Sequence, residues 1–283
     1  MRRLGAVAKT DAAEAPGALR MLAGWAAERG LALLVEKETA DLVPDLHLAT
    51  ARKADLPSHS DLMVVLGGDG TLLSMARAVG DLAIPIVGVN LGDLGFLTAT
   101  TLDEMIPALD AVLRGEMVIE ERMMLATRVH RGDKVVGTWL GLNDTVITKA
   151  AMSRIINLSV SIDGQHAILY RADGLIVSTP TGSTAYSLSA GGPILYPTMD
   201  AVVLTPICSH TLTNRPIVVP GAQHVEITLL TSQEVMLTVD GQVGFGLREH
   251  DRVEVGRAPA AIRLVRFKDF FSVLRTKLKW GER

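Results

Sequence analysis

The decisive stretch of this sequence is Leu62-Met63-Val64-Val65-Leu66, followed directly by Gly67-Gly68-Asp69-Gly70-Thr71. The first five residues have the length and apolar character of a buried parallel strand. After the glycines, apolar residues recur at helical spacing from Leu72 to Val79, and Gly80 ends the pattern. The stretch therefore predicts a strand, a glycine turn and a helix, with Asp69 inside the turn.

This turn has the features of a phosphate-handling loop that also carries an acid. Glycines allow the backbone to approach a ligand closely, and the N-terminus of a helix presents free N–H groups to an anion. A carboxylate there would repel a phosphate, so Asp69 is expected to address a hydroxyl group or a metal ion beside it. The pattern favours a kinase that acts on a small-molecule alcohol. It is neither a Walker A loop nor a dinucleotide fingerprint, and an ordinary β-turn is the alternative reading.

Composition limits the class of protein. The chain has 283 residues, 48% of them hydrophobic, which is enough for one large or two medium domains. A net charge of -3 without a basic run gives no support for nucleic-acid binding. Cys208 stands alone, which excludes an intrachain disulfide and a multi-cysteine metal site, and it is expected to be a small buried residue. Without a signal peptide or membrane-spanning segment in its pattern, the chain is expected to be soluble and cytoplasmic.

Two domains and a terminal helix are predicted from the change in pattern along the chain. Strand and helix patterns alternate over residues 1–115, which predicts an α/β domain with a parallel sheet and ligands at the carboxyl ends of its strands. Residues 116–268 show short strand patterns in succession, with Asp163-Gly164 as a hairpin turn, and predict a mostly β, substrate-binding domain. Residues 269–283 predict a C-terminal helix that packs on the first domain.

A second unusual segment runs from Asp173 to Pro193. A strand pattern ends at Thr179-Pro180, and hydroxyl residues, glycines and a short helical stretch follow. Small side chains at the end of a strand suit a flat polar ligand such as a nucleotide. A tightly packed irregular loop would use the same residues.

Together these segments resemble the bacterial NAD kinases. Blocks in the family's order cover most of the chain: Gly67–Thr71, Gly88–Leu97, Asn143-Asp144, Asp173–Pro193, Asn214–Pro216 and Asp240–Gln242. The resemblance implies phosphoryl transfer from ATP to the 2′-hydroxyl of the adenosine ribose of NAD, giving NADP. It also implies Mg²⁺ or another divalent cation with ATP, and a homodimer or homotetramer.

The resemblance assigns roles to the acidic motifs. Asp69 corresponds to the general base, and Gly70 lies against the substrate. Asn143 and Asp144 match a pair that holds ribose hydroxyls, although this chain has Asp where the family usually has Glu. Asp173 corresponds to the acceptor for an exocyclic amino or amide group.

Further binding residues also follow from the resemblance. The residues implied for the adenine pocket and the rest of the dinucleotide are Thr184, Ala185, Tyr186, Ser187, Ser189, Arg154, Arg171 and Gln242. For the two arginines, a solvated surface position is the alternative. Arg171 also resembles the residue of members that prefer NAD to NADH.

Two rivals to this interpretation are a lipid or sugar kinase with the same glycine loop and a non-catalytic NADP sensor. The Thr181–Pro193 block disfavours the first, and the presence of Asp69 disfavours the second. Inorganic polyphosphate stays open as a donor besides ATP.

Overall fold

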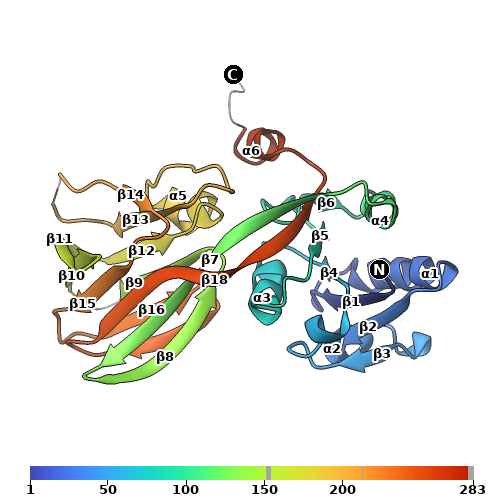
Figure 1. Cartoon of the computed structure of the whole chain (residues 1–283), viewed down its shortest axis with the longest axis horizontal. Coiled ribbons are helices and arrows are strands. Elements are labelled where there is room, and N and C mark those ends of the chain that lie inside the picture. The colour runs from blue at the N-terminus through green and yellow to red at the C-terminus, as the bar shows by residue number, and fades with distance from the viewer. Residues whose placement is uncertain (151–153, 212, 280–283) are drawn as a thin grey trace. The chain divides into compact units, whose positions relative to one another are not determined.

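The computed structural model describes residues 1–150, 154–211 and 213–279 and divides the chain into two compact units. Unit 1 comprises Met1–Glu121 with Ala261–Arg283, and unit 2 comprises Arg122–Ala260 (Figure 1). Residues 280–283, at the end of the expected C-terminal helix, lie outside the described part. Helix α6 (Phe270–Leu278) belongs to unit 1. Within the described ranges, no helix is long and apolar enough to cross a membrane.

Unit 1 is built around a parallel sheet. The strand order is β3 (Ala49–Ala51), β2 (Ala32–Glu36), β1 (Arg3–Ala8), β4 (Leu62–Leu66) and β5 (Ile86–Asn90). Every neighbouring pair in this order is parallel, as expected for strands joined by helices. The short β6 (Thr100–Thr101) pairs in parallel with the end of β5. Parallel strands begin at one edge of the sheet and end at the other, so the carboxyl ends of β1, β2, β4 and β5 share one edge.

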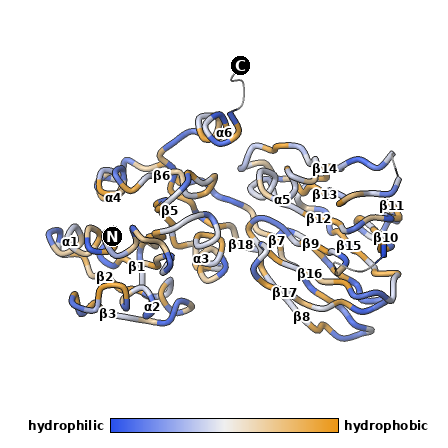
Figure 2. Tube along the Cα trace, turned by 180° about the vertical axis from the view of Figure 1, so that it is seen from behind, coloured by the Kyte–Doolittle hydropathy of each residue, from blue (hydrophilic) through white to orange (hydrophobic). Residues whose placement is uncertain are grey.

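The helices of unit 1 cover this sheet and close its core. They are α1 (Ala15–Glu28), α2 (Lys37–Ala40), α3 (Asp69–Val79) and α4 (Met105–Arg114). Helix α1 alternates hydrophobic and hydrophilic positions along its length (Figure 2). Its buried Leu19, Leu22 and Trp25 pack in one cluster with β1, β4 and β5. A buried stripe of this kind holds a helix on a sheet by removing apolar surface from water.

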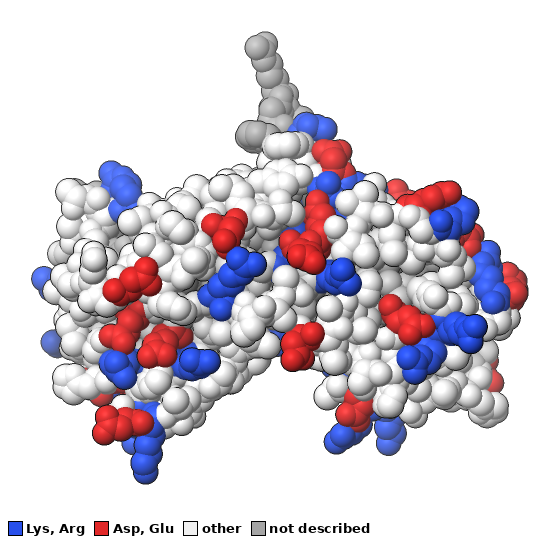
Figure 3. Space-filling view, viewed as in Figure 1, with Lys and Arg blue, Asp and Glu red and all other residues white. Residues whose placement is uncertain are grey.

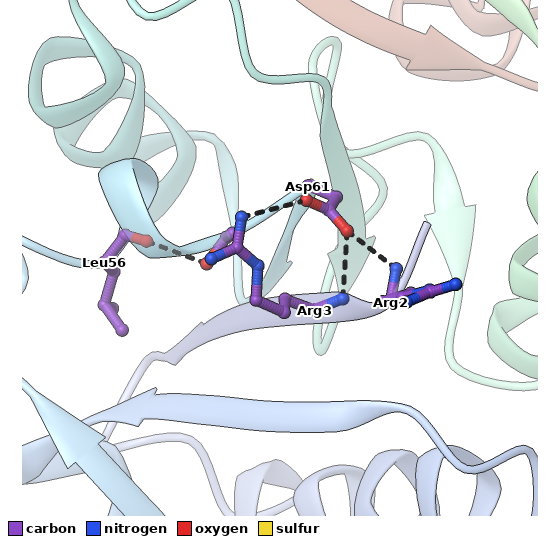
Figure 4. Close-up of polar contacts among 5 residues, drawn as sticks. Arg2, Arg3, Leu56 and Asp61 are labelled. Carbon is purple, nitrogen blue, oxygen red and sulfur yellow. Dashed lines mark hydrogen bonds and ion pairs between the residues drawn. The ribbon is translucent and has the colours of Figure 1, made fainter.

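Asp61 fixes the start of the central strands (Figure 4). Its carboxylate accepts hydrogen bonds from the backbone N–H groups of Arg2 at 2.6 Å and Arg3 at 3.1 Å. The Arg3 guanidinium lies 3.4 Å from the same carboxylate. These donors, the Arg2 N–H first, hold the pKa of Asp61 below its usual range. The start of β1 is thereby tied to the residue before β4, in the register that pairs Leu4 with Leu62.

Unit 2 is mostly β. One antiparallel sheet has the order β14 (Ile217–Pro220), β13 (Ala201–Ile207), β12 (Gly174–Ser178), β9 (Asp144–Lys149), β16 (Val235–Val239) and β17 (Val243–Leu247). A second antiparallel run joins β11 (Gln165–Ala172), β10 (Ile156–Ile162), β15 (Val225–Leu229) and β18 (Arg252–Arg266). Strands β7 (Val118–Arg131) and β8 (Lys134–Gly141) pair with each other, and β7 also pairs with β18.

The core of unit 2 lies between its strands. Leu158, Ile227 and Val253 of the second run pack in one cluster with Ile147, Val177 and Leu237 of the first sheet. Hydrophobic and hydrophilic residues alternate along several of these strands (Figure 2). That alternation gives each strand one buried face, as in two packed β layers.

The expected Asp-Gly hairpin is confirmed, and the expected burial of Cys208 is wrong. Asp163 and Gly164 both have positive φ, 48° and 76°, in the hairpin between β10 and β11, as expected for an Asp-Gly turn. Cys208 is exposed rather than buried, because it lies just after β13 at a φ of 45°. Strand β13 contains Pro206. The prolines of sheets sit where no partner needs their N–H, and β14 pairs with β13 only from Ala201 to Leu204.

Charges are mixed on the surface. On the face shown in Figure 3, acidic and basic side chains of the described residues lie interspersed, without a continuous patch of either sign. That distribution agrees with the small net charge of the chain.

Candidate active site

The glycine loop lies where β4 ends and α3 begins. The Gly67 N–H donates to the Val89 carbonyl at 2.8 Å, which holds the loop against β5. A side chain at Gly67 would meet Thr71 Oγ1 at 2.7 Å and Lys9 Cβ at 3.1 Å, so the turn needs a glycine there. Helix α3 begins at Asp69, three residues earlier than the apolar spacing indicated, with Gly68 as its N-cap. The first N–H groups of the helix therefore lie in the loop itself.

A cavity of about 640 Å³ opens at this edge of the unit 1 sheet. Its lining comes from the ends of β1, β2, β4 and β5 and includes Lys9, Glu36, Gly68, Thr71 and Asn90. This is the edge at which open parallel sheets hold ligands. The volume lies within the usual range of small-molecule pockets.

The charges around this cavity are mixed, with acids in excess. The lining contains two lysines, Lys9 and Lys53, and four acids: Asp11, Glu36, Glu38 and Asp93. Lys9 lies 3.7 Å from Asp11, and Lys53 lies 3.8 Å from Glu36. A polyanion entering the cavity would meet a surplus of negative charge.

The Asp69 carboxylate is directed toward the segment Gly95–Thr98. Oδ2 accepts the Phe96 N–H at 2.9 Å. Oδ1 accepts the N–H groups of Leu97 at 3.1 Å and Thr98 at 3.0 Å, and the Thr98 hydroxyl at 2.9 Å. Asp69 is half-buried, and these four hydrogen bonds fix the orientation of its carboxylate.

In unit 2, Asn143 and Asp144 lie at the start of β9, and Asp240 holds their backbone. The Asp240 carboxylate accepts the N–H groups of Leu142 at 3.1 Å, Asn143 at 2.8 Å and Asp144 at 3.3 Å. The Asp240 N–H in turn donates to the Asp144 carbonyl at 3.0 Å. Asp240 has a φ of 51° and Gly241 one of 63°, which turns β16 into β17. Asp240 therefore forms the hairpin turn with Gly241 and, through its side chain, also fixes the segment that carries Asn143 and Asp144.

Asp144 has an unusual protonation state. Burial, and then the nearby charge of Asp240, raise its pKa from 3.8 to about 7. Near neutral pH a substantial fraction of Asp144 therefore carries a proton and has a hydrogen-bond donor as well as acceptors.

This raised pKa predicts that Asp144→Asn stabilises the fold, and that the gain in unfolding free energy depends on pH. The folded-state pKa lies above the unfolded value, so the folded chain binds a proton more tightly and wild-type stability falls as pH rises from about 4 to about 7. Asparagine has no such dependence. We expect the variant's advantage in unfolding free energy to be about 3 kcal/mol larger at pH 8 than at pH 5. Urea unfolding at pH 5 and pH 8 measures it, and a difference that does not change with pH would contradict the assignment.

The segment after β12 is packed against Asn143. The Thr179 N–H donates to the Asn143 carbonyl at 2.9 Å, and its hydroxyl donates to the Leu142 carbonyl at 2.6 Å. The Gly182 N–H donates to Thr179 Oγ1 at 3.0 Å. A Cβ on Gly182 would collide with the backbone carbonyl of Asn143. Asn143, Asp144 and the Thr179–Gly182 turn therefore form one rigid assembly.

The expected adenine-pocket residues form the short helices that follow. Thr184 ends the 3-10 turn Gly182–Thr184, and Tyr186 begins α5 (Tyr186–Ser189). Tyr186 is 44% exposed, so its ring is accessible for stacking. Ala185 is half-buried and Ser189 exposed. Ser187 is fully buried, and its hydroxyl bonds that of Thr205 at 2.9 Å, which is a structural contact.

The other expected contacts lie on nearby strands of unit 2. Asp173, between β11 and β12, pairs with Lys149 at 3.5 Å. Arg171 is an exposed residue of β11, and Arg154 is exposed just before β10. Gln242 is exposed in the turn two residues after Asp240. In the described ranges, no group of three or more histidine, cysteine or acidic side chains is arranged to hold a metal ion.

Comparison with known proteins decides the family. Residues 4–117 match the model of the ATP-NAD kinase N-terminal domain, and residues 142–267 match that of the ATP-NAD kinase C-terminal domain. This chain belongs to the ATP-NAD kinase family.

Relatives of the ATP-NAD kinase family match the whole chain. The NAD kinases of Geotalea daltonii and Geobacter metallireducens are 51% and 49% identical over 286 residues, with 100% of each chain covered. The yeast NADH kinase crystallised with NADH superposes with a TM-score of 0.94 at 26% identity, over 100% of this chain and 89% of its own. An Archaeoglobus fulgidus NAD kinase in complex with ATP shares the fold, with a TM-score of 0.80 at 22% identity, over 98% of each chain.

Membership of the ATP-NAD kinase family confirms the main expectations. The α/β domain with a parallel sheet and the mostly β domain are as predicted. ATP-dependent phosphorylation of NAD to NADP is also confirmed, which rules out the lipid- or sugar-kinase rival.

The structure adds polar residues around the site that the sequence did not single out for such contacts. Thr98 and the segment around it hold Asp69, and Lys149 pairs with Asp173. Thr98 directly follows the family-like block Gly88–Leu97, so its place in the sequence could have marked it as a candidate site residue. Lys149 is distant in sequence from its partner, and only strand pairing brings the two together: Thr148 of β9 lies opposite Gly174 of β12.

Proposed function

We propose that Asp69 is the general base of this NAD kinase and takes the proton of the ribose 2′-hydroxyl as the γ-phosphoryl group of ATP is transferred to it. The observation that carries the proposal is the position of Asp69. Asp69 is half-buried at the N-terminus of α3, between Gly68 and Gly70, which line the unit 1 cavity together with Thr71 although Asp69 itself does not. A weak nucleophile such as a ribose hydroxyl gains from a carboxylate within hydrogen-bond reach.

The same cavity is the proposed place of the ATP phosphates. The N–H groups at the start of α3 and the dipole of this helix favour an anion there. The excess of acids around the cavity opposes a bare triphosphate. We infer that a divalent cation enters with ATP, because Mg²⁺ is commonly held by phosphate oxygens with one or two carboxylates. Such an ion would neutralise charge on the transferring group.

NAD is proposed to bind to unit 2. Asn143 and Asp144 would hold ribose hydroxyls, and a partly protonated Asp144 suits this role because it offers both a donor and acceptors. Asp173 would accept from an amino or amide group, and the exposed Tyr186 would stack on a base. Gly70 of the loop, with Thr184, Ala185, Ser189, Arg154, Arg171 and Gln242, completes the proposed contacts. Ser187 is assigned a supporting role, since its hydroxyl is buried against Thr205.

NADP formation from NAD and ATP with Mg²⁺ tests this assignment, with Tyr186→Ala as the informative variant. Stacking of a base on an aromatic ring contributes about 1–3 kcal/mol, so we expect KM for NAD to rise by roughly 5- to 100-fold. The KM for ATP and the melting temperature should stay near wild type. Leu169→Ala removes a similarly exposed apolar side chain from β11 and serves as the control. An unchanged KM for NAD in Tyr186→Ala would refute stacking at this residue.

The oligomeric state and the cytoplasmic location stay predictions. Size-exclusion chromatography with light scattering distinguishes the expected homodimer or homotetramer from a monomer. Replacing ATP by polyphosphate in the assay decides whether the second donor is used.

A further inference from the structure

The two carboxylate oxygens of Asp69 are not equivalent. Oδ1 accepts three hydrogen bonds, from the N–H groups of Leu97 and Thr98 and from the Thr98 hydroxyl. Oδ2 accepts one, from the Phe96 N–H. Since a carboxylate oxygen has about two lone-pair positions, Oδ1 is saturated and Oδ2 keeps capacity for another hydrogen.

Asn90 sets the direction of the Thr98 hydroxyl. The Asn90 side-chain oxygen accepts the Gly92 N–H at 2.6 Å, which identifies the other end of the amide as the donor. That Nδ2 donates to the Asp93 carbonyl at 2.7 Å and to Thr98 Oγ1 at 2.9 Å. With its oxygen already accepting, the Thr98 hydroxyl sends its own hydrogen to Asp69 Oδ1. The chain of donors thus runs one way, from Asn90 through Thr98 to Asp69.

The residues around this series of hydrogen bonds leave little room for another arrangement of the Asp69 carboxylate. Thr98 is fully buried, and Asn90 is 5% exposed. Gly95 lies so close to Asp69 that a Cβ there would collide with Oδ1 and also with Thr98 Oγ1. The segment Gly95–Thr98 therefore wraps one side of the carboxylate at a distance that only glycine permits.

We propose that Asn90 and Thr98 are positioning residues that lock the Asp69 carboxylate and leave Oδ2 as the oxygen that receives the 2′-hydroxyl proton. The inference rests on the proposed function of Asp69 as the base. As the new bond forms between the 2′-oxygen and the γ-phosphorus, the bond from that phosphorus to the ADP oxygen breaks. The hydroxyl proton moves to Oδ2, and ADP leaves with the electron pair of the broken bond.

Loss of the Thr98 hydroxyl would let the carboxylate turn and share its charge differently between its oxygens. Misorientation of a catalytic group costs rate in the chemical step and leaves substrate binding unchanged. We therefore expect Thr98→Val, which keeps the size of the side chain, to lower kcat by about 10- to 100-fold with KM for NAD and ATP within twofold. Thr98→Ser keeps the hydroxyl and should retain kcat within about threefold of wild type.

The experiment measures kcat and both KM values for Thr98→Val, Thr98→Ser and Thr98→Ala, with thermal unfolding of each. Thr100→Val is the matched control, since Thr100 is also buried in this region but is not one of the donors to Asp69. If the valine variant fails to fold, the ratio of kcat between Ser and Ala gives the same information, because both lack the methyl group. A kcat for Thr98→Val or Thr98→Ala equal to that of Thr98→Ser would overturn the proposal.

A double-mutant cycle separates this proposal from the one on which it rests. If Thr98 acts through Asp69, adding Thr98→Val to Asp69→Asn should lower kcat by less than twofold further. Full turnover in Asp69→Asn alone would reject the base. A large loss of kcat in Asp69→Asn together with a normal kcat in Thr98→Val would support Asp69 as the base and reject the positioning role of Thr98. A full additive loss in the double variant would show that Thr98 acts independently of Asp69.

Discussion

Asp69→Asn is expected to lower kcat by on the order of 100-fold or more, the usual scale for losing a general base. KM for NAD should change little, because the proposed NAD contacts lie mainly in unit 2. The assay is NADP formation under saturating NAD and ATP with Mg²⁺. Turnover near the wild-type value in a folded variant would refute the role of Asp69.

The structure also predicts a stability cost for this variant. An asparagine oxygen at the Oδ1 position still accepts from Leu97 and Thr98, but the amide NH₂ then faces the Phe96 N–H, where two donors meet. The unpaired N–H costs about 1–3 kcal/mol. Asp61→Asn is a matched control, because Asp61 also binds two backbone N–H groups in unit 1, at the other end of the strands. Both of these N–H groups bond Oδ2, so the asparagine oxygen can keep them; this variant should lose less stability than Asp69→Asn and keep kcat near wild type.

Gly182→Ala is expected to weaken NAD binding and the fold of unit 2 together. The added methyl group would collide with the Asn143 carbonyl oxygen and approach the Asn143 Cα at 2.7 Å. These are backbone atoms and cannot rotate aside, so the turn must shift and strain the bonds that join Thr179 to Asn143. Overpacking of this kind costs about 1–3 kcal/mol, sometimes more. We expect a loss of about 3 kcal/mol in unfolding free energy and a KM for NAD raised at least about 10-fold.

Gly246→Ala provides the control for this effect. Gly246 lies in β17 of the same unit, and a Cβ there would meet nothing within 4 Å. The control variant should have wild-type stability within about 0.5 kcal/mol and an unchanged KM. Wild-type stability and KM in Gly182→Ala would show that the turn relaxes freely and does not position Asn143.

Local pattern was sufficient for the parts of the fold that are continuous in sequence. The apolar run Leu62–Leu66 forms a buried strand, and Asp163-Gly164 forms the expected hairpin turn. Such features depend on side-chain periodicity and on backbone preferences within a few residues. Strand β13 contains Pro206, which lies beyond the part of this strand that pairs with β14. Cys208 lies in an apolar stretch, yet the end of that strand exposes it.

The sequence by itself determined the family, the reaction and the candidate base, because the motifs at Gly67–Thr71 and Asp173–Pro193 are contiguous and specific. The tertiary structure decided how these motifs are supported. Asp240 is 96 residues from Asp144, and Asp69 is 29 residues from Thr98, yet each pair is joined by hydrogen bonds. Such contacts follow from strand order and register, which bring distant backbone N–H groups to one carboxylate. The shifted pKa of Asp144 has the same origin, since burial and a neighbouring charge arise only once the chain has folded.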